Sequence, residues 1–325
     1  MKPFNYIKEE TVKAVLSSNI GDSKYIAGGT NLIDLMKKDI AQPDSVVDVT
    51  SALSNKIEKQ SRSIRIGAMA SNTAVSNHER ILSEYPLISK AILAGASPQI
   101  RNMASTGGNL LQRTRCPYFY DVTTPCNKRK PNSGCSAING ENRMSAVIGY
   151  NDQCVAVHPS DFCVALAALD AKVNILDSTQ KNITIKFTDF HKLPESTPQK
   201  DNNLPEKALI TSIEIPENSF NKNYAYVKVR DRDSYAFALV SVAAGLDLKN
   251  NKIVEARLAS GGVAHKPWRW YEAEKFLKGK EASVDNFTQA ANIAIKDLKP
   301  LSHNGFKVEM LKGAIVTALQ NCISI

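Results

Sequence analysis

Apolar and polar positions alternate along the chain with two different periods, and together they predict a mixed opening of strands and helices. A period of two marks strands near 4–7, 24–27 and 46–49, and a helical period marks 11–16 and 31–40. A second unit begins at the alternating strand 63–67 and continues with helical periodicity at 72–78 and 87–93. The pattern therefore predicts two α/β units in succession.

The periodicity lapses over 112–154, a stretch with several prolines and glycines, and then resumes. A helix is expected at 160–169, with strands at 172–176, 182–187, 208–215, 224–229, 236–248 and 253–260. A hairpin turn at 249–251 and helices at 268–277, 286–298 and 306–322 complete the pattern. Because strands and helices segregate toward the end, the last part reads as an antiparallel sheet with helices on one face.

These elements predict an α+β fold class with two domains. The first covers 1–221, is divided into subdomains at about 1–55 and 56–221, and carries the insertion 112–154. The second covers 222–325. A loop as long as the insertion is unusual inside a compact domain and is normally functional.

Composition narrows the class of partner. The chain of 325 residues is 43% hydrophobic, enough for a substantial core, and its net charge is +9. The basic residues are spread along the chain, which disfavours a nucleic-acid partner. No run reaches the roughly 18 apolar residues of a membrane span. The N-terminus shows neither an apolar signal segment nor twin arginines, so by itself the chain is expected in the cytoplasm.

Two double-glycine segments are the strongest candidates for binding chemistry: Ala27-Gly28-Gly29-Thr30-Asn31 and Thr106-Gly107-Gly108-Asn109. Glycine tolerates positive φ, so such segments can turn several backbone N–H groups toward one anion. Thr30 and Asn31 begin a predicted helix whose N-terminal dipole would add to the site. The two segments are therefore predicted to hold a diphosphate from both sides, although neither has the G-x-G-x-x-G spacing of a Rossmann site.

A third segment, His158-Pro159-Ser160-Asp161, precedes the predicted helix 160–169. Ser160 or Asp161 could cap that helix, and taken alone this structural role is the better interpretation. His158 is equally compatible with a place near a cofactor and with a structural hydrogen bond.

Taken together, these segments resemble the FAD-binding subunit of the molybdenum hydroxylases, the xanthine dehydrogenase and CO dehydrogenase group. That family holds the FAD diphosphate with AGGT- and TGGN-type segments, which match 25–32 and 104–111 here. The resemblance covers nearly the whole chain and implies a two-subdomain FAD-binding domain of PCMH/VAO type, followed by a domain like the C-terminal domain of CO dehydrogenase flavoproteins. The residues that it assigns to FAD are Ile26, Ala27, Gly28, Gly29, Thr30, Asn31, Leu32, Arg101, Thr106, Gly107, Gly108, Asn109, Ser160, Asp161 and Lys228.

The insertion carries four of the six cysteines: Cys116, Cys126, Cys135 and Cys154. They are separated by nine, eight and eighteen residues, without the close C-x₂-C pair of zinc knuckles and ferredoxins. The spacing alone leaves buried thiols and a zinc site open. The surrounding run 113–129 resembles the FAD subunit of periplasmic aldehyde oxidoreductases, and this resemblance implies a [4Fe–4S] cluster on the four cysteines.

Charge in the insertion fits that implication. Four thiolates around a [4Fe–4S] core leave net negative charge, which nearby cations would offset and thereby raise the reduction potential. The candidate cations are Arg113, Arg115, Lys128, Arg129 and Lys130. The remaining cysteines, Cys163 and Cys322, fall at apolar positions of predicted helices and are expected to be buried structural thiols.

The resemblance implies an electron-transfer subunit of a molybdenum-dependent aldehyde oxidoreductase, without catalytic residues of its own. Its partners would be a large molybdenum-cofactor subunit and a small subunit with two [2Fe–2S] clusters, forming a heterotrimer that passes electrons to an external acceptor. The resembling bacterial enzyme is exported with a partner that carries the signal, so a periplasmic location is equally compatible with this chain.

Three alternatives stay open at this point. The chain could be the FAD subunit of another molybdenum hydroxylase, of xanthine dehydrogenase or 4-hydroxybenzoyl-CoA reductase type. It could be a reductase related to the bacterial cell-wall flavoenzymes, which would need acid–base residues and no iron. It could also be a non-redox assembly or sensor protein that binds FAD or a cluster.

Overall fold

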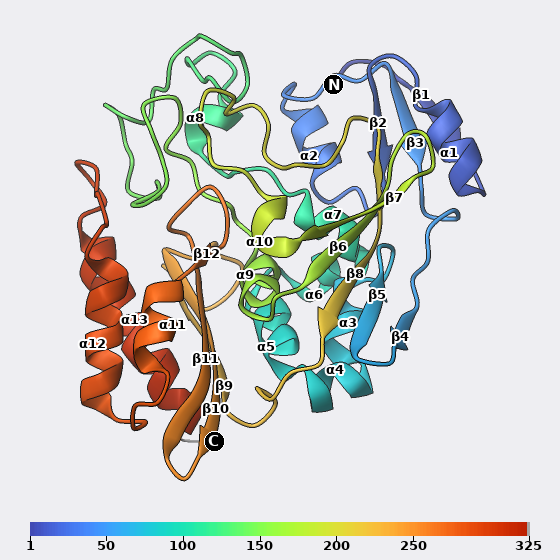
Figure 1. The fold of residues 1–325 in the computed structure, drawn as a ribbon. Coiled ribbons are helices and arrows are strands. Elements are labelled where there is room, and N and C mark those ends of the chain that lie inside the picture. The colour runs from blue at the N-terminus through green and yellow to red at the C-terminus, as the bar shows by residue number, and fades with distance from the viewer. Residues whose placement is uncertain (324–325) are drawn as a thin grey trace.

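Three separate sheets organise residues 1–323, the part of the chain that the computed structural model describes (Figure 1). The first is a parallel sheet with strand order β1-β3-β2. Its elements are β1 (Asn5–Lys8), α1 (Val12–Ser18), β2 (Ser23–Ile26), α2 (Leu32–Lys37) and β3 (Ser45–Asp48). Val15 of α1 is fully buried against Val47 and Val49, so this unit has a small core of its own. The observed elements match the first expected unit.

The second sheet is antiparallel, with strand order β4-β5-β8-β6-β7. Its strands are β4 (Ile57–Lys59), β5 (Ser63–Gly67), β6 (Lys172–Leu176), β7 (Asn182–Lys186) and β8 (Leu209–Pro216). The accompanying helices are α3 (Asn72–Asn77), α4 (Glu79–Glu84), α5 (Pro86–Ala94), α6 (Pro98–Met103), α7 (Thr106–Leu110), α9 (Asp161–Ala168) and α10 (Phe187–Phe190). The apolar pattern did not predict β4, α4 or α10, which are only three to six residues long. Helix α9 is apolar except for Asp161 at its first position and is buried throughout, because it packs into the core of the second sheet and against the third sheet.

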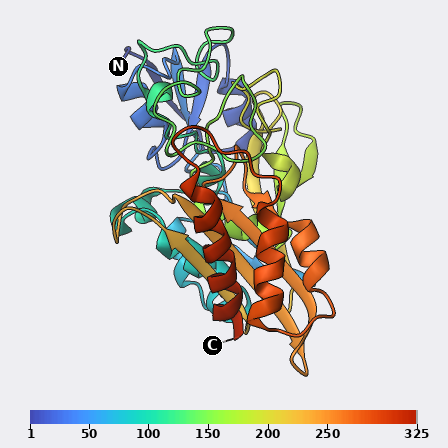
Figure 2. The same cartoon turned by 90° about the vertical axis from the view of Figure 1, so that its left-hand side faces the viewer.

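The third sheet forms the C-terminal part, with strand order β12-β11-β10-β9. Its elements are β9 (Tyr224–Val229), β10 (Val240–Lys249), β11 (Lys252–Gly261), β12 (Trp268–Arg269), α11 (Tyr271–Leu277), α12 (Val284–Ile295) and α13 (Phe306–Ile323). Helices α11 to α13 cover one face, as expected (Figure 2). Helices α5 and α9 of the preceding part pack against this sheet as well, so the two parts share a buried interface. Asn250 and Asn251, both at positive φ, make the β10–β11 turn.

One expected helix boundary is wrong. Residues 268–270 were expected to open a helix, but Trp268 and Arg269 form β12 and pair with β11. The helix begins only at Tyr271. Trp270 donates from its indole nitrogen to Ser260 Oγ (2.7 Å), so the aromatic residues here anchor the strand rather than a helix face.

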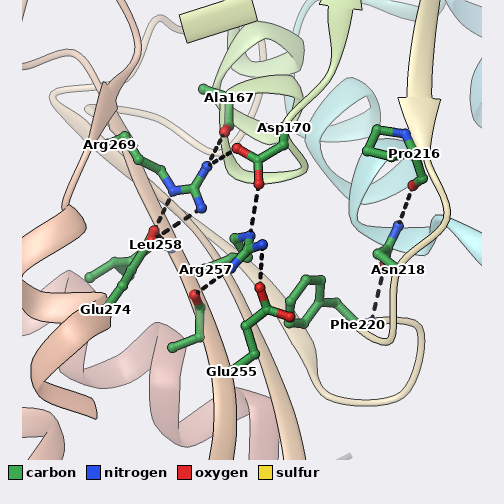
Figure 3. A network of polar contacts seen from close by, with 11 residues as sticks. Ala167, Asp170, Pro216, Asn218, Phe220, Glu255, Arg257, Leu258, Arg269 and Glu274 are labelled. Carbon is green, nitrogen blue, oxygen red and sulfur yellow. Dashed lines mark hydrogen bonds and ion pairs between the residues drawn. The ribbon is translucent and has the colours of Figure 1, made fainter. Parts of the chain in front are cut away.

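An ion-pair network joins the third sheet to the end of α9 (Figure 3). The buried Arg269 donates to the carbonyl of Ala167 (2.7 Å) and to Asp170 (2.8 Å), and it also pairs with Glu274. Arg257 adds a second link to Asp170 (3.1 Å). Because these contacts fix the C-terminal end of α9, they also hold its N-terminal end, which reaches the site described below.

The insertion 112–154 contains a single short helix, α8 (Pro117–Tyr120), and otherwise consists of turns and bends. Phe119 of α8 is fully buried and packs against Leu35 of α2, so the insertion lies on the first unit (Figure 1). No helix within residues 1–323 has the length and apolarity needed to cross a bilayer.

Candidate cofactor sites

A cavity of about 980 Å³ opens where the first unit, α7, α9 and the third sheet meet. All of the residues that the sequence assigned to FAD line it, with the exception of Thr106. They come from four separate parts of the chain, so the fold brings together what the sequence holds far apart. The cavity is also large enough for a dinucleotide-sized ligand, since ligand pockets usually measure about 300–1,000 Å³.

The first glycine segment is built to offer backbone donors. It follows β2 and leads into α2, and Gly29 has φ +71°, which glycine adopts without strain. Within the described residues, the N–H groups of Thr30, Asn31 and Leu32 have no protein acceptor, as expected at the start of a helix. Gly28 packs so closely that a Cβ would lie 1.7 Å from the carbonyl oxygen of Met103. This segment can therefore present several N–H groups to an anion.

The second glycine segment differs from the expectation. Residues 106–110 form the short helix α7, capped by Ser105, and Gly107 and Gly108 do not adopt positive φ. The N–H of Gly107 donates to the carbonyl of Ala68 (2.8 Å), and that of Gly108 donates to Ser105 Oγ (3.1 Å). Thr106 is fully buried and its hydroxyl donates to the carbonyl of Ala70 (2.9 Å). The prediction that these N–H groups are free for an anion was therefore wrong, because the helix and its cap already bind them.

The start of α9 contributes an ion pair to the cavity wall. Ser160 caps the helix, since its Oγ accepts from the N–H of Cys163 (3.1 Å), and it also donates to Asn109 Oδ1 (2.5 Å). Asp161 is buried and accepts from Lys228 Nζ (2.8 Å) and from the hydroxyl of Tyr226 (2.7 Å). Burial, aided by Asp161, raises the pKa of Tyr226 well above its usual range, so the phenol stays a donor. Of the two caps considered, Ser160 is the one used.

Two further contributors to the cavity could not be found from local patterns. Arg115 turns away from the cysteines and donates to Asp34 (3.2 Å), to the hydroxyl of Tyr120 (2.6 Å) and to Asn31 Oδ1 (3.3 Å). Arg143 and Asp231, which are 88 residues apart, form a two-pronged ion pair on the cavity wall (2.7 and 2.9 Å). Only the fold reveals such long-range pairs.

The four cysteines of the insertion line one second, much smaller cavity. All four are free thiols, and Cys126 faces Cys135 across an isolated antiparallel bridge. Among residues 1–323, His158, Cys163 and His191 form another group of potential ligands, whose donor atoms all lie within 4.8 Å of one another. Four free cysteines around one cavity are a donor set that suits either a zinc ion or an iron–sulfur cluster.

The pKa values of the cysteine thiols shift in different directions. Cys154 donates a hydrogen bond to Cys135, which lowers the pKa of Cys135 to about 6 and raises that of Cys154 above its usual range. Burial raises the pKa of Cys116 to about 11. Metal centres bind thiolates, and a bound metal deprotonates a thiol that would otherwise stay protonated. The four sulfurs fit a thiolate-ligated metal centre.

Three histidines are buried, and one of them, His158, lines the larger cavity. Burial lowers the pKa of His191 to about 4, that of His265 to about 3, and that of His158 well below its usual range. His158 Nδ1 accepts from the N–H of Ser160 (3.3 Å), and His191 Nε2 bonds the carbonyl of Leu110 (2.8 Å). The ammonium of Lys128 further disfavours positive charge on His158 and His265. These rings are therefore neutral. His158 both makes a hydrogen bond to the backbone and lines the larger cavity, so neither of its two expected roles is excluded. Cys163 and Cys322 are the buried thiols that the sequence predicted.

Comparison with known proteins agrees with both the fold and the cavity. Residues 2–218 match the family described as the FAD binding domain in molybdopterin dehydrogenase, and residues 224–323 match the CO dehydrogenase flavoprotein C-terminal domain. The chain is 44% identical over 323 residues to the aldehyde oxidoreductase FAD-binding subunit PaoB of Escherichia coli (strain K12), covering 98% of both chains. It is 28% identical to the glyceraldehyde dehydrogenase medium chain of Sulfolobus acidocaldarius, covering 93% of this chain and 91% of that one.

Solved structures agree at the level of the fold. Quinoline 2-oxidoreductase from Pseudomonas putida 86 superposes with a TM-score of 0.77 at 20% identity, covering 100% of this chain and 99% of that one. Carbon monoxide dehydrogenase from Hydrogenophaga pseudoflava gives a TM-score of 0.76 at the same identity and coverage. The family matches span both domains, and the relative at 44% identity spans the whole chain. The chain therefore belongs to the molybdenum hydroxylase family of oxidoreductases, as an FAD-binding subunit.

Proposed function

We propose that this chain is the electron-transferring subunit of a molybdenum-dependent aldehyde oxidoreductase and holds both FAD and a [4Fe–4S] cluster. The observation that carries the proposal is the pairing of two cavities in one chain, one lined by the FAD-assigned residues and one lined by four free cysteines. The similarity to PaoB, an aldehyde oxidoreductase subunit, supports an aldehyde as the substrate of the complex.

The first glycine segment supplies the diphosphate site in this proposal. The N–H groups of Thr30, Asn31 and Leu32 have no acceptor in the part of the chain that the structure describes, and α2 adds the positive end of its peptide dipoles. The second segment forms the opposing wall through close packing: a Cβ on Gly107 would lie 3.1 Å from that of Ala68. Lys228 and Asp161 close the side of the cavity that faces the third sheet. The expected role of Thr106 at the cofactor is withdrawn, because its hydroxyl is buried and bonded to Ala70.

When bound, FAD supplies chemistry that accepts electrons in pairs and passes them on singly or in pairs. The chain's own residues bind and orient it, and none of them acts as acid, base or nucleophile on the aldehyde. The partners are a large molybdenum-cofactor subunit and a small subunit with two [2Fe–2S] clusters, in a heterotrimer, with an external electron acceptor.

Cys116, Cys126, Cys135 and Cys154 are the proposed cluster ligands. Their thiols converge from four separate turns of the insertion, and Cys126 and Cys154 are buried. Four thiolates are the usual ligand set of a [4Fe–4S] cluster, which supplies one-electron chemistry. The proposal also keeps the two expected domains, 1–221 and 222–325, whose boundary falls in the connection between β8 and β9.

Replacing Cys126 with Ser tests the cluster. We expect the purified complex to lose the four irons assigned to this chain and to keep its FAD, because Cys126 lines only the smaller cavity, whereas Cys116 lines both. Cys322→Ser is the matched control, since Cys322 is an equally buried thiol on α13 that lies in neither cavity. Iron and flavin per chain are the measurements, with zinc determined in parallel.

The outcomes separate the alternatives. Iron that stays constant in Cys126→Ser would show that these cysteines are not the ligands. Stoichiometric zinc without iron would replace the cluster with a zinc site. A complex whose flavin is not reduced by any aldehyde, but is reduced by another molybdenum hydroxylase substrate, would move the assignment to a different enzyme of the family.

A further inference from the structure

Only one basic side chain of the insertion faces the cysteine cavity. Five cations were expected to surround the cysteines, but Lys128 is the one that lines the cavity. Lys130 is exposed, and Arg115 faces the FAD-assigned cavity instead. The guanidinium of Arg129 donates hydrogen bonds to the carbonyls of Tyr118, Phe119 and Thr124, and these bonds stabilise the conformation of the insertion. Of the five expected cations, Lys128 is therefore the one placed to offset negative charge on a group bound by the four cysteines.

Lys128 is held in place by a partly exposed counter-ion, Asp201, whose side chain is 21% exposed. The Lys128 side chain is 3% exposed, and its ammonium donates to Asp201 (2.6 Å) and to the carbonyl of Pro198 (2.8 Å). Burial alone would raise the pKa of Asp201, but Lys128 and Arg113 lower it to about 2, so the carboxylate is charged. Arg113 completes the triad by donating to the other oxygen of Asp201 (2.7 Å). The charge of Lys128, whose side chain is buried, is screened less than the charge of a surface lysine.

We propose that Lys128 and Asp201 act as a pair of positioning residues that set the reduction potential of the group held by the four cysteines. This inference rests on the proposed function, because it needs a redox-active group at that site. Gaining one electron, without any bond being made or broken, adds one negative charge beside Lys128. The ammonium stabilises that reduced state and raises the potential, whereas Asp201, being farther from the cavity, partly opposes it.

The test uses the purified holoenzyme complex, with an electron paramagnetic resonance titration against a low-potential chemical reductant. In Lys128→Met, we expect the ratio of oxidised to reduced cluster at a fixed potential to rise at least tenfold, which corresponds to a midpoint about 59 mV lower for one electron. In Asp201→Asn, we expect a shift of opposite sign. Lys130→Met is the matched control, and we expect less than a threefold change because its ammonium is exposed.

A merely structural role would not shift the reduction potential in opposite directions in Lys128→Met and Asp201→Asn. Shifts of the same sign in Lys128→Met and Asp201→Asn, or no shift in either with iron content intact, would overturn the inference. If Lys128→Met fails to retain iron, Asp201→Asn and the double variant carry the test, and the double variant should return toward the wild-type potential. A wild-type complex without iron at these cysteines would overturn the proposed function instead, so the two failures are distinguishable.

Discussion

The two glycine segments line the same cavity, yet they work in different ways. In the first segment, the N–H groups of Thr30, Asn31 and Leu32 have no acceptor among residues 1–323, and Gly29 has positive φ. The second has ordinary helical backbone, and its N–H groups are bound by Ala68 and Ser105. The first therefore provides donors and the second provides a flat, closely packed wall. Two similar glycine segments thus have different roles. In the first, glycine leaves backbone N–H groups free to donate, and in the second, the absence of a side chain allows close packing.

The largest effect is expected from Gly28→Ala. The new Cβ would lie 1.7 Å from the carbonyl oxygen of Met103, and a backbone atom cannot rotate away. We expect a loss of on the order of 3 kcal/mol or more in the free energy of unfolding, together with loss of FAD. Urea unfolding and flavin content measure the two effects.

Gly313→Ala on α13 is the control for this substitution, because nothing lies within 4 Å of its Cβ position and alanine favours a helix. It should leave flavin content unchanged. A Gly28→Ala complex with full flavin and wild-type stability would show that the first segment does not pack on Met103 as described, and the contrast between the segments would lose its basis.

Acidification should lower the free energy of unfolding, because His191, which bonds the end of α7, becomes protonated. His191 bonds the carbonyl of Leu110 at the end of α7, and burial lowers its pKa to about 4 from 6.5. The stability that comes from its neutral form is fully present above pH 6.5 and is lost as the pH falls toward 4. We expect this one group to cost on the order of 3 kcal/mol over that range.

Urea unfolding of wild type and His191→Gln at several pH values checks this dependence, since glutamine can keep the bond to Leu110 without titrating. His303→Gln is the matched control, because the His303 side chain is half-exposed and its ring pairs with Glu141 at the surface. Equal pH dependence of stability in wild type and His191→Gln would exclude His191 as the source.

The sequence predicted the order of nearly all longer elements, and the residues assigned to FAD by resemblance, except Thr106, line the large cavity. The reasons for the failures are specific. Strand and helix periods depend on local apolar spacing, so β5, β6 and β9 were expected at their observed bounds. Whether a glycine N–H is free depends on what packs beside it, and Ala68 and Ser105 could not be recognised as its acceptors. The Lys128–Asp201 pair joins residues 73 positions apart, which no local pattern encodes.

The smallest effects give the sharpest comparison, between Gly29→Ala and Gly108→Ala. Gly29 has φ +71° and a Cβ there would lie 3.2 Å from Ile33 Cγ1, so alanine should cost about 1–2 kcal/mol and weaken FAD retention. Gly108 lies within α7, where alanine gains up to about 1 kcal/mol of helix propensity. Its new Cβ meets only Ser105 Oγ at 2.9 Å, a hydroxyl that can shift at the expense of the cap. These opposing terms should leave the free energy of unfolding of Gly108→Ala within about 0.5 kcal/mol of wild type.

Flavin content and urea unfolding of the two variants, measured side by side, decide between the roles of the two segments. Equal losses in both variants would mean that the second segment also depends on the backbone freedom of glycine. A loss confined to Gly29→Ala would assign that need to the first segment alone.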